Sequence, residues 1–189
     1  NDVLLETFLL TDDTVSISNA VATINPTADL DYGVSYYLTI ASNAVLDANG
    51  NAYAGISDTT TLNFSASITN LSQLDTALAA NTSDITISAS LDVTARDLSP
   101  VSSITIDNSA ASAVTLTMTA EQVHTLAGNI TKGTNDLVVA QVQSGDTNIS
   151  AYTLTDANSI DLNNIANVTL TTEQGLIGLS NDNGVILSD

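Results

Sequence analysis

The sequence predicts an all-β protein, with a β-sandwich module over residues 1–66 and a β-solenoid-like repeat region over residues 67–189. Short alternating segments lie between turn residues, and similar segments recur at a period of about 50 residues. Thr, Ser, Asn and Asp are abundant; β-branched residues fit pleated strands, while Asn, Asp and Ser side chains stabilise turns. Because aromatic residues make up only 4% of the chain, we expect a core built mainly from Ile, Val, Leu and Ala.

Four segments of the first third alternate between apolar and polar residues and are predicted strands. They cover residues 14–18, 20–25, 34–40 and 60–65. Turn residues separate them, namely Asn25-Pro26, Asp31-Tyr32-Gly33 and the run from Asp47 to Asn51. Closely spaced short strands with turn residues between them are typical of a sandwich.

The order of motifs in this region resembles the bacterial Ig-like domain of S-layer proteins and large surface adhesins. The motifs are Ala22-Thr-Ile-Asn-Pro-Thr, Asp29-Leu-Asp-Tyr-Gly-Val-Ser-Tyr-Tyr-Leu-Thr-Ile, Asp47-Ala-Asn-Gly-Asn-Ala-Tyr-Ala-Gly and Leu62-Asn-Phe. The resemblance covers residues 1–66. It implies a β-sandwich, an extracellular location and a spacer or adhesive role. The family module is longer at its N-terminal side, so we expect this copy to lack its first strand or strands and to expose a strand edge.

The remaining two thirds contain an internal repeat whose units begin with the same helix-start signal. A capping residue is followed three positions later by Gln, in the pairs Asn70 and Gln73, Thr119 and Gln122, and Thr171 and Gln174. This is the capping-box spacing, in which the two side chains satisfy free backbone N–H groups. It predicts a short helix after each of the first two caps.

The strand segments after these caps also recur, which defines units at residues 70–118, 119–170 and 171–189. The segment that starts at Asn81 aligns with those at Gly133 and Asn181, and Ser103–Asn108 aligns with Ser159–Asn164. A unit with a helical turn and several short strands favours a β-solenoid, with a second sandwich as the alternative. The third unit is incomplete, so we expect a longer array, because repeat units bury their faces against neighbours.

Charge and composition exclude several classes of function. The formal net charge is −19, with 21 acidic residues against Arg96 and Lys132. Phosphate binding needs a basic surface, so we expect no nucleic-acid partner and no attraction to anionic membranes. We also expect no membrane insertion, because no apolar run approaches the length of a span. The lack of cysteine excludes disulfides and Cys-ligated zinc.

Calcium is the cofactor that the acidic residues favour. Eighteen of the 21 acids are Asp, and several lie in predicted turns, where short carboxylates cap loops or bind hard cations. The candidate ligands are Asp47, Asn49 and Asn51 in one loop, with Asp29 and Asp31 as weaker candidates. The alternative for the first loop is a tight turn stabilised by Asp47 and Asn49-Gly50.

The sequence offers little for catalysis, so we expect no enzyme activity. With His124 as the one histidine and no cysteine, a His-based zinc site or a Ser–His triad is excluded. No glycine-rich phosphate loop is present. Tyr36 and Tyr37 are adjacent, so in an ordinary strand one side chain faces the core and the other faces out. The alternative interpretation is a surface on which sugar rings stack.

These observations predict a structural or adhesive module of a secreted bacterial cell-surface protein, either an S-layer protein or a giant adhesin, stabilised by calcium. The alternative is a module that binds a surface glycan. We expect the partners to be neighbouring copies or domains of the same protein, or glycans. Of two apolar segments, 3–10 and 184–188, one is expected to pair with a strand that it does not neighbour in sequence, because uncovered strand edges accept further strands.

Overall fold

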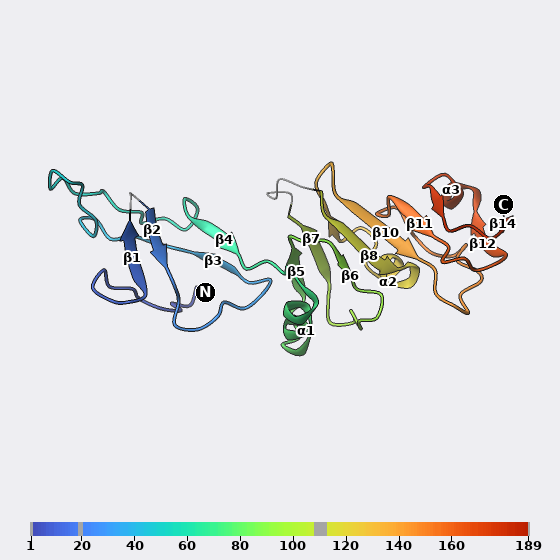
Figure 1. Ribbon diagram of the computed structural model, residues 1–189, viewed down its shortest axis with the longest axis horizontal. Coiled ribbons are helices and arrows are strands. Elements are labelled where there is room, and N and C mark those ends of the chain that lie inside the picture. Colours follow the sequence, from blue (N-terminus) through green and yellow to red (C-terminus); the bar gives the residue numbers. More distant parts are fainter. Residues whose placement is uncertain (1, 19–20, 108–112, 189) are drawn as a thin grey trace. The chain divides into compact units, whose positions relative to one another are not determined.

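The computed structural model describes residues 2–18, 21–107 and 113–188, and it divides into two compact units, residues 1–66 and 67–189 (Figure 1). Within the described residues there are fourteen strands and three short helices. The predicted fold class is therefore confirmed: the chain is mostly β, with short helices confined to the second unit.

The first unit contains two small antiparallel sheets. β1 (Val15–Ser18) pairs with β2 (Val21–Ile24), and β3 (Ser35–Tyr37) pairs with β4 (Asn63–Ser65). Each strand lies inside a predicted segment but is shorter than predicted. Isolated bridges between Ile40 and Ile56, and between Leu46 and Ala52, extend the antiparallel pairing toward the loops.

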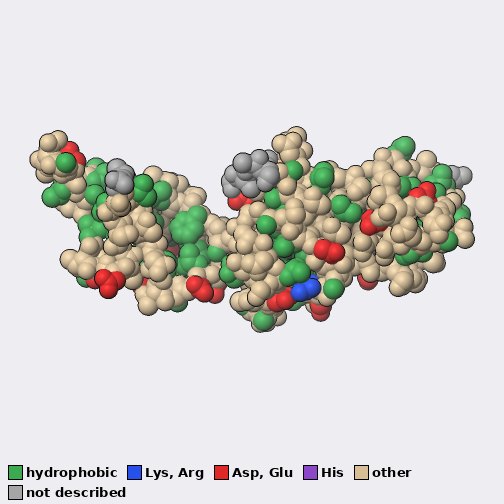
Figure 2. All heavy atoms as spheres, in the orientation of Figure 1, with side chains coloured by type: hydrophobic (Ala, Val, Ile, Leu, Met, Phe, Trp, Pro, Cys, Tyr) green, Lys and Arg blue, Asp and Glu red, His purple; other side chains and the backbone are tan. Residues whose placement is uncertain are grey.

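Among the described residues of the first unit, none is buried. Leu5 is 64% exposed, Ile17 53% and Phe64 48%. Hydrophobic side chains are correspondingly visible on the surface of this unit, at the left in Figure 2. Two-stranded sheets are marginal by themselves, because they have too few neighbours to enclose a core. The predicted exposure of a strand edge fits this arrangement.

The second unit is built from three sheets in which every described pairing is parallel. The first sheet has the order β5-β7-β9, the second β13-β11-β10-β8-β6 and the third β12-β14. This pattern is a β-solenoid, and it excludes the alternative of a second antiparallel sandwich. The bounds of these strands are β5 (Asp84–Ile87), β6 (Leu91–Asp92), β7 (Ser103–Ile106), β8 (Thr115–Thr119), β9 (Ile130–Thr131), β10 (Leu137–Gln141), β11 (Ser159–Asp161), β12 (Val168–Thr171), β13 (Leu179–Ser180) and β14 (Val185–Ser188).

The two apolar segments near the ends of the chain behave differently. The later one contains β14, which pairs with β12 and so passes over β13, its neighbour in sequence. The earlier one, residues 3–10, contains no described strand. The expected pairing with a strand that is not adjacent in sequence is therefore confirmed for the later segment, where the parallel register of the solenoid provides the partner.

One coil of the solenoid is much shorter than one unit of the sequence repeat. The Ser103 hydroxyl on β7 bonds Asp84 on β5, 19 residues earlier, and the Asn181 side chain bonds Asp161, 20 residues earlier. The helix caps that open the units, Asn70, Thr119 and Thr171, are spaced far more widely along the chain. Each complete sequence unit therefore contains more than two coils.

The core of the solenoid is a stack of aliphatic side chains. Along β5, Ile85 and Ile87 are buried while Asp84 and Thr86 are not, and β8 and β10 alternate in the same way. Parallel register places inward residues directly above one another, as with Leu116 and Val138. All 27 buried apolar residues of the described chain lie in the second unit, and none is aromatic. Burial of each large side chain stabilises the fold by roughly 1.5–3 kcal/mol.

Each sequence repeat begins with a helix, and in successive repeats this helix follows a strand of the first, the second and the third sheet in turn. α1 (Leu71–Ala79) follows Ile68, which bridges to Ile87 of the first sheet. α2 (Ala120–Thr125) follows β8 of the second sheet, and α3 (Thr172–Gly175), a helix that the sequence did not predict, follows β12 of the third. One sequence repeat therefore corresponds to a whole number of coils plus the step from one sheet to the next.

Asn residues turn several corners between sheets. Six described non-glycine residues have positive φ, and all are Asn: 43, 81, 163, 164, 167 and 181. Asn tolerates this left-handed conformation better than other residues with a side chain, because its amide bonds the local backbone. The recurrence of Asn near strand ends is thus explained by backbone geometry. Asn108, the last residue of the aligned segment Ser103–Asn108, lies outside the described residues.

Candidate functional site

Several of the polar side chains that join coils lie at two places, which we call the helix–turn junctions. The first junction consists of α1, the turn Val93–Arg96 and α2. The second consists of α2, the turn from Ile149 to Tyr152 and α3. Each turn is closed by one backbone bond, from Arg96 N–H to the Val93 carbonyl and from Tyr152 N–H to the Ile149 carbonyl, both 2.9 Å.

A glutamine on each later helix connects the helix start to the turn. In α2, Gln122 Oε1 accepts from the Thr119 N–H at 2.8 Å, and the backbone N–H of Gln122 donates to Thr119 Oγ1 at 3.1 Å. The predicted capping box is therefore confirmed in α2 and, between Thr171 and Gln174, in α3. In α1 the Asn70 side chain accepts from the Gln73 N–H, but Gln73 Oε1 accepts from Thr69 and not from the cap, so the box is incomplete.

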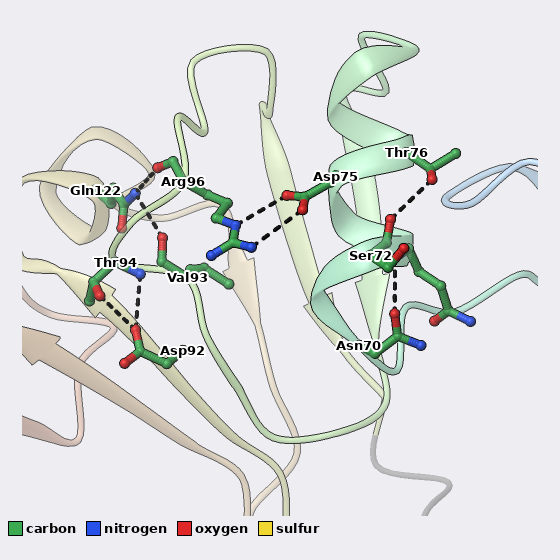
Figure 3. Close-up of polar contacts among 10 residues, drawn as sticks. Asn70, Ser72, Asp75, Thr76, Asp92, Val93, Thr94, Arg96 and Gln122 are labelled. Carbon is green, nitrogen blue, oxygen red and sulfur yellow. Dashed lines mark hydrogen bonds and ion pairs between the residues drawn. The ribbon is translucent and has the colours of Figure 1, made fainter.

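The same glutamine side chains make a second set of bonds that the capping box does not explain. Gln122 Nε2 donates to the carbonyls of Val93 and Arg96, at 3.4 and 2.7 Å (Figure 3). Gln174 Nε2 donates to the carbonyls of Ile149 and Tyr152, at 2.8 Å each, and only 5% of Gln174 is exposed. One side-chain amide thus satisfies the helix start and two turn carbonyls, which would otherwise lose hydrogen bonds on burial.

An ion pair completes the first junction. Arg96 Nε and Nη2 donate to the two oxygens of Asp75 on α1, at 3.1 and 3.3 Å (Figure 3). The hydrogen bonds from Arg96 lower the pKa of the Asp75 carboxyl. The side chains are 28% and 53% exposed, so solvent screens the pair and its contribution is modest.

An aromatic contact occupies the matching place in the second junction. The rings of His124 and Tyr152 are stacked, with centroids 5.1 Å apart and planes 6° apart. The Thr153 N–H donates to His124 Nδ1 at 2.9 Å, and the Tyr152 hydroxyl donates to the Asp146 carboxylate. The one histidine of the chain therefore has a structural role, as an acceptor and a stacking partner.

Several carboxylates on turns and strands accept hydrogen bonds that lower their pKa. Asp58 accepts from the N–H and hydroxyl groups of Thr60 and Thr61, and these bonds lower its pKa far below the ordinary range. Bonds from Ser103 and Ser83 lower the pKa of Asp84. Burial opposes ionisation of Asp161, yet bonds from Asn181, Asn163 and Gln141 bring a net lowering of its pKa.

The candidate calcium ligands lie in two exposed loops of the first unit. Asp47 Oδ1 accepts from the N–H groups of Asn49 and Asn51, and Oδ2 accepts from Asn51 Nδ2, each at 2.8 Å. Hydrogen bonding, first of all from the Asn51 side chain, lowers the pKa of Asp47. These bonds are those of the tight turn that the sequence offers as the alternative interpretation. Across residues 2–18, 21–107 and 113–188, no three His, Asp or Glu side chains are grouped as metal ligands would be.

The second candidate loop contains a contact of a different kind. The N–H of Asp31 donates to the Tyr36 hydroxyl at 2.9 Å, while Asp29 and Asp31 are exposed. The Tyr36 ring stacks on Phe64, with centroids 5.9 Å apart. A tyrosine hydroxyl bonded to backbone a few residues upstream has the form of the tyrosine corner of Ig-like sandwiches.

Comparison with known families agrees with this geometry. Residues 6–66 match the model of the bacterial Ig-like domain. The first unit is a bacterial Ig-like domain. Such domains occur in bacterial surface proteins. No curated protein and no solved structure matches the chain, and none of the described helices has the length and apolar character needed to cross a membrane.

The sequence indicated the helix caps but not the turn carbonyls that the glutamines bind. The available signal was the shared spacing of Asp92 and Thr94 and of Asn148 and Ser150. In each pair the first side chain accepts from the N–H and hydroxyl two residues later, and this contact opens the turn. Polar pairs that recur at one place around Val93 and Ile149 therefore mark the two turns.

Proposed function

We propose that this chain is a structural module of a secreted bacterial cell-surface protein, an S-layer protein or a large adhesin, and that it is not an enzyme. The observation that carries the proposal is the combination of an Ig-like domain with a parallel β-solenoid in one chain. Solenoid units contact mainly their neighbours, so they extend a chain along one axis and suit a spacer role. Neighbouring copies or domains of the same protein are the proposed partners.

The polar chemistry of the described residues supports this proposal. Their hydrogen bonds cap helices, close turns and join coils, and the histidine accepts a backbone bond. A cavity of about 420 Å³ beside Arg96 and Gln122 is also lined by Thr119 of the capping box and by the carboxylates of Asp97 and Glu121. An acidic surface with a net charge of −19 favours solubility and discourages association with nucleic acid.

Localisation provides the decisive experiment. Antibodies raised against the chain are applied to intact cells of the source bacterium and to permeabilised cells. The proposal predicts equal labelling of both, with removal of the signal from intact cells by external protease. Labelling that appears only after permeabilisation would contradict it. Purified chain that retains a soluble oligosaccharide from an extract of the cell surface would favour the glycan-binding alternative.

Calcium enters the proposal as a stabilising counter-ion. The acidic side chains are dispersed over the face seen in Figure 2, and self-repulsion at a net charge of −19 opposes the compact state. Divalent cations near turn carboxylates reduce this repulsion. The test compares thermal unfolding in calcium and in chelator at equal ionic strength, with magnesium as the control. We expect a higher midpoint in calcium; identical midpoints would remove calcium from the proposal.

A further inference from the structure

The two helix–turn junctions contain one shared contact and one contact that differs. The shared contact is the bonding of two turn carbonyls by Gln122 and by Gln174. The contact that differs is made by the helix residue five positions after the cap, Asp75 in α1 and His124 in α2. These residues contact the fourth residue of the following turn, which is Arg96 or Tyr152.

We propose that this helix residue and this turn residue form a pairing position that determines which turn can lie against which helix. The glutamine contacts cannot discriminate between the units, because they involve the same groups in both. The pairs can discriminate. If the second turn lay against α1, Tyr152 would face Asp75, and neither the ion pair nor the ring stack could form. Similar units that can associate in more than one register need such differences between right and wrong contacts.

The third helix shows the same position without a turn against it. The residue five positions after Thr171 is Leu176, and it is 82% exposed. Within the described part of the chain no turn residue covers it. Leu176 is the C-cap residue directly after α3, whereas Asp75 and His124, at the same distance from their caps, are each contacted by a turn residue of a later coil. This makes Leu176 a matched control for substitutions at position five.

A cycle of substitutions in the full chain tests whether the pair is coupled. The variants are Asp75→His, Arg96→Tyr and the two together, which places the second pair in the first junction at unchanged net charge. Each single change is expected to lower the Tm by about 1–4 °C, and the combination should recover most of the loss. The control pair, Ser72→His with Arg96→Tyr, should show no recovery, and Leu176→His alone should leave the Tm unchanged. Additive losses in the Asp75 and Arg96 cycle would overturn the proposal.

Refolding then tests discrimination separately from stability. The Asp75→His and Arg96→Tyr combination makes both pairing positions identical, so we expect a lower yield of native protein on dilution from denaturant despite a near-parental Tm. Adding His124→Asp and Tyr152→Arg makes the two pairs different again and should restore the yield. A combination variant that refolds as well as the parent would overturn the role in register, because discrimination would then be dispensable.

Discussion

The two units of this chain have similar residue types but differ in how they bury them. The first unit has apolar strands in two small antiparallel sheets, and none of its described residues is buried. The second unit has equally short strands, yet it contains all 27 buried apolar residues of the described chain. The difference is stacking: each coil pairs with the coil before it, so even the three-residue strand β11 has a neighbouring strand on both sides. Burial in this protein follows from topology more than from composition.

The largest predicted effect tests the difference in core burial between the two units. Leu116 is fully buried between coils, whereas Leu62 in the first unit is 40% exposed. Leu116→Ala is expected to lower the free energy of unfolding of the second unit by about 2–5 kcal/mol, because it removes packed atoms and leaves a cavity. Leu62→Ala should cost about 1 kcal/mol or less. Urea unfolding followed by circular dichroism measures both, and equal losses would refute the assigned core.

The next effect concerns the buried amide that joins coils. Gln174→Ala removes one half of a capping box and the side-chain donor to the carbonyls of Ile149 and Tyr152, of which the Ile149 carbonyl keeps its bond from the Tyr152 N–H. We expect a loss of about 1–3 kcal/mol in the free energy of unfolding. Gln73→Ala is the matched control, since the Gln73 side chain accepts from Thr69 but donates to no carbonyl within the described residues. A cost for Gln73→Ala as large as that for Gln174→Ala would show that the turn contacts add nothing.

A smaller effect tests the first unit at its tyrosine corner. Tyr36→Phe removes the hydroxyl that accepts from the Asp31 N–H and retains the ring that stacks on Phe64. The expected loss is about 1 kcal/mol in the stability of the first unit, with no change in the second. Tyr37→Phe on the same strand is the control. A loss of stability of equal size in this variant would show that the Tyr36 hydroxyl bond contributes nothing specific. Tyrosine fluorescence would follow the first unit, which contains four of the five tyrosines.

Acid is expected to have the smallest site-specific effect. Bonds from Thr60 and Thr61 lower the pKa of Asp58, so its folded pKa lies below the unfolded value of about 4. The stability that this carboxylate contributes is fully present above the unfolded pKa and is lost as the pH falls through the folded pKa. The difference in stability between the parent and Asp58→Asn should therefore shrink as the pH falls below about 4. If the stability difference between the parent and Asp58→Asn does not change with pH, the charge of the carboxylate contributes nothing and hydrogen-bond geometry alone explains that difference.

The sequence was a good guide to features set by local chemistry. Alternation located the strands of the first unit, and the spacing of Thr119 to Gln122 located a helix start, because strand and cap geometry depend on neighbouring residues. The turn at Asp47 was also among the interpretations that the sequence offered. These features are decided within a short stretch of chain.

The sequence could not show features set by contacts between coils. The long sequence repeat concealed the shorter coils, although β5 and β7 place the same Ile-Thr-Ile sequence in register, because the helix caps that mark the repeat recur only once per sequence unit. The second set of Gln122 bonds reaches a turn 26 residues earlier, a separation that no local pattern encodes. The pairing of Arg96 with Asp75 and of Tyr152 with His124 became visible only when the register placed the residues together.

Native-state amide hydrogen exchange tests most directly the claim that stacked coils, and not residue composition, provide the stability of this chain. The account predicts the slowest exchange at inward strand positions in the middle of the stack, such as Leu116, Val138 and Ile160, and fast exchange throughout residues 2–66. Protection in β1–β4 equal to that in β8 and β10 would contradict the account, because it would require in the first unit a core that its described residues do not form.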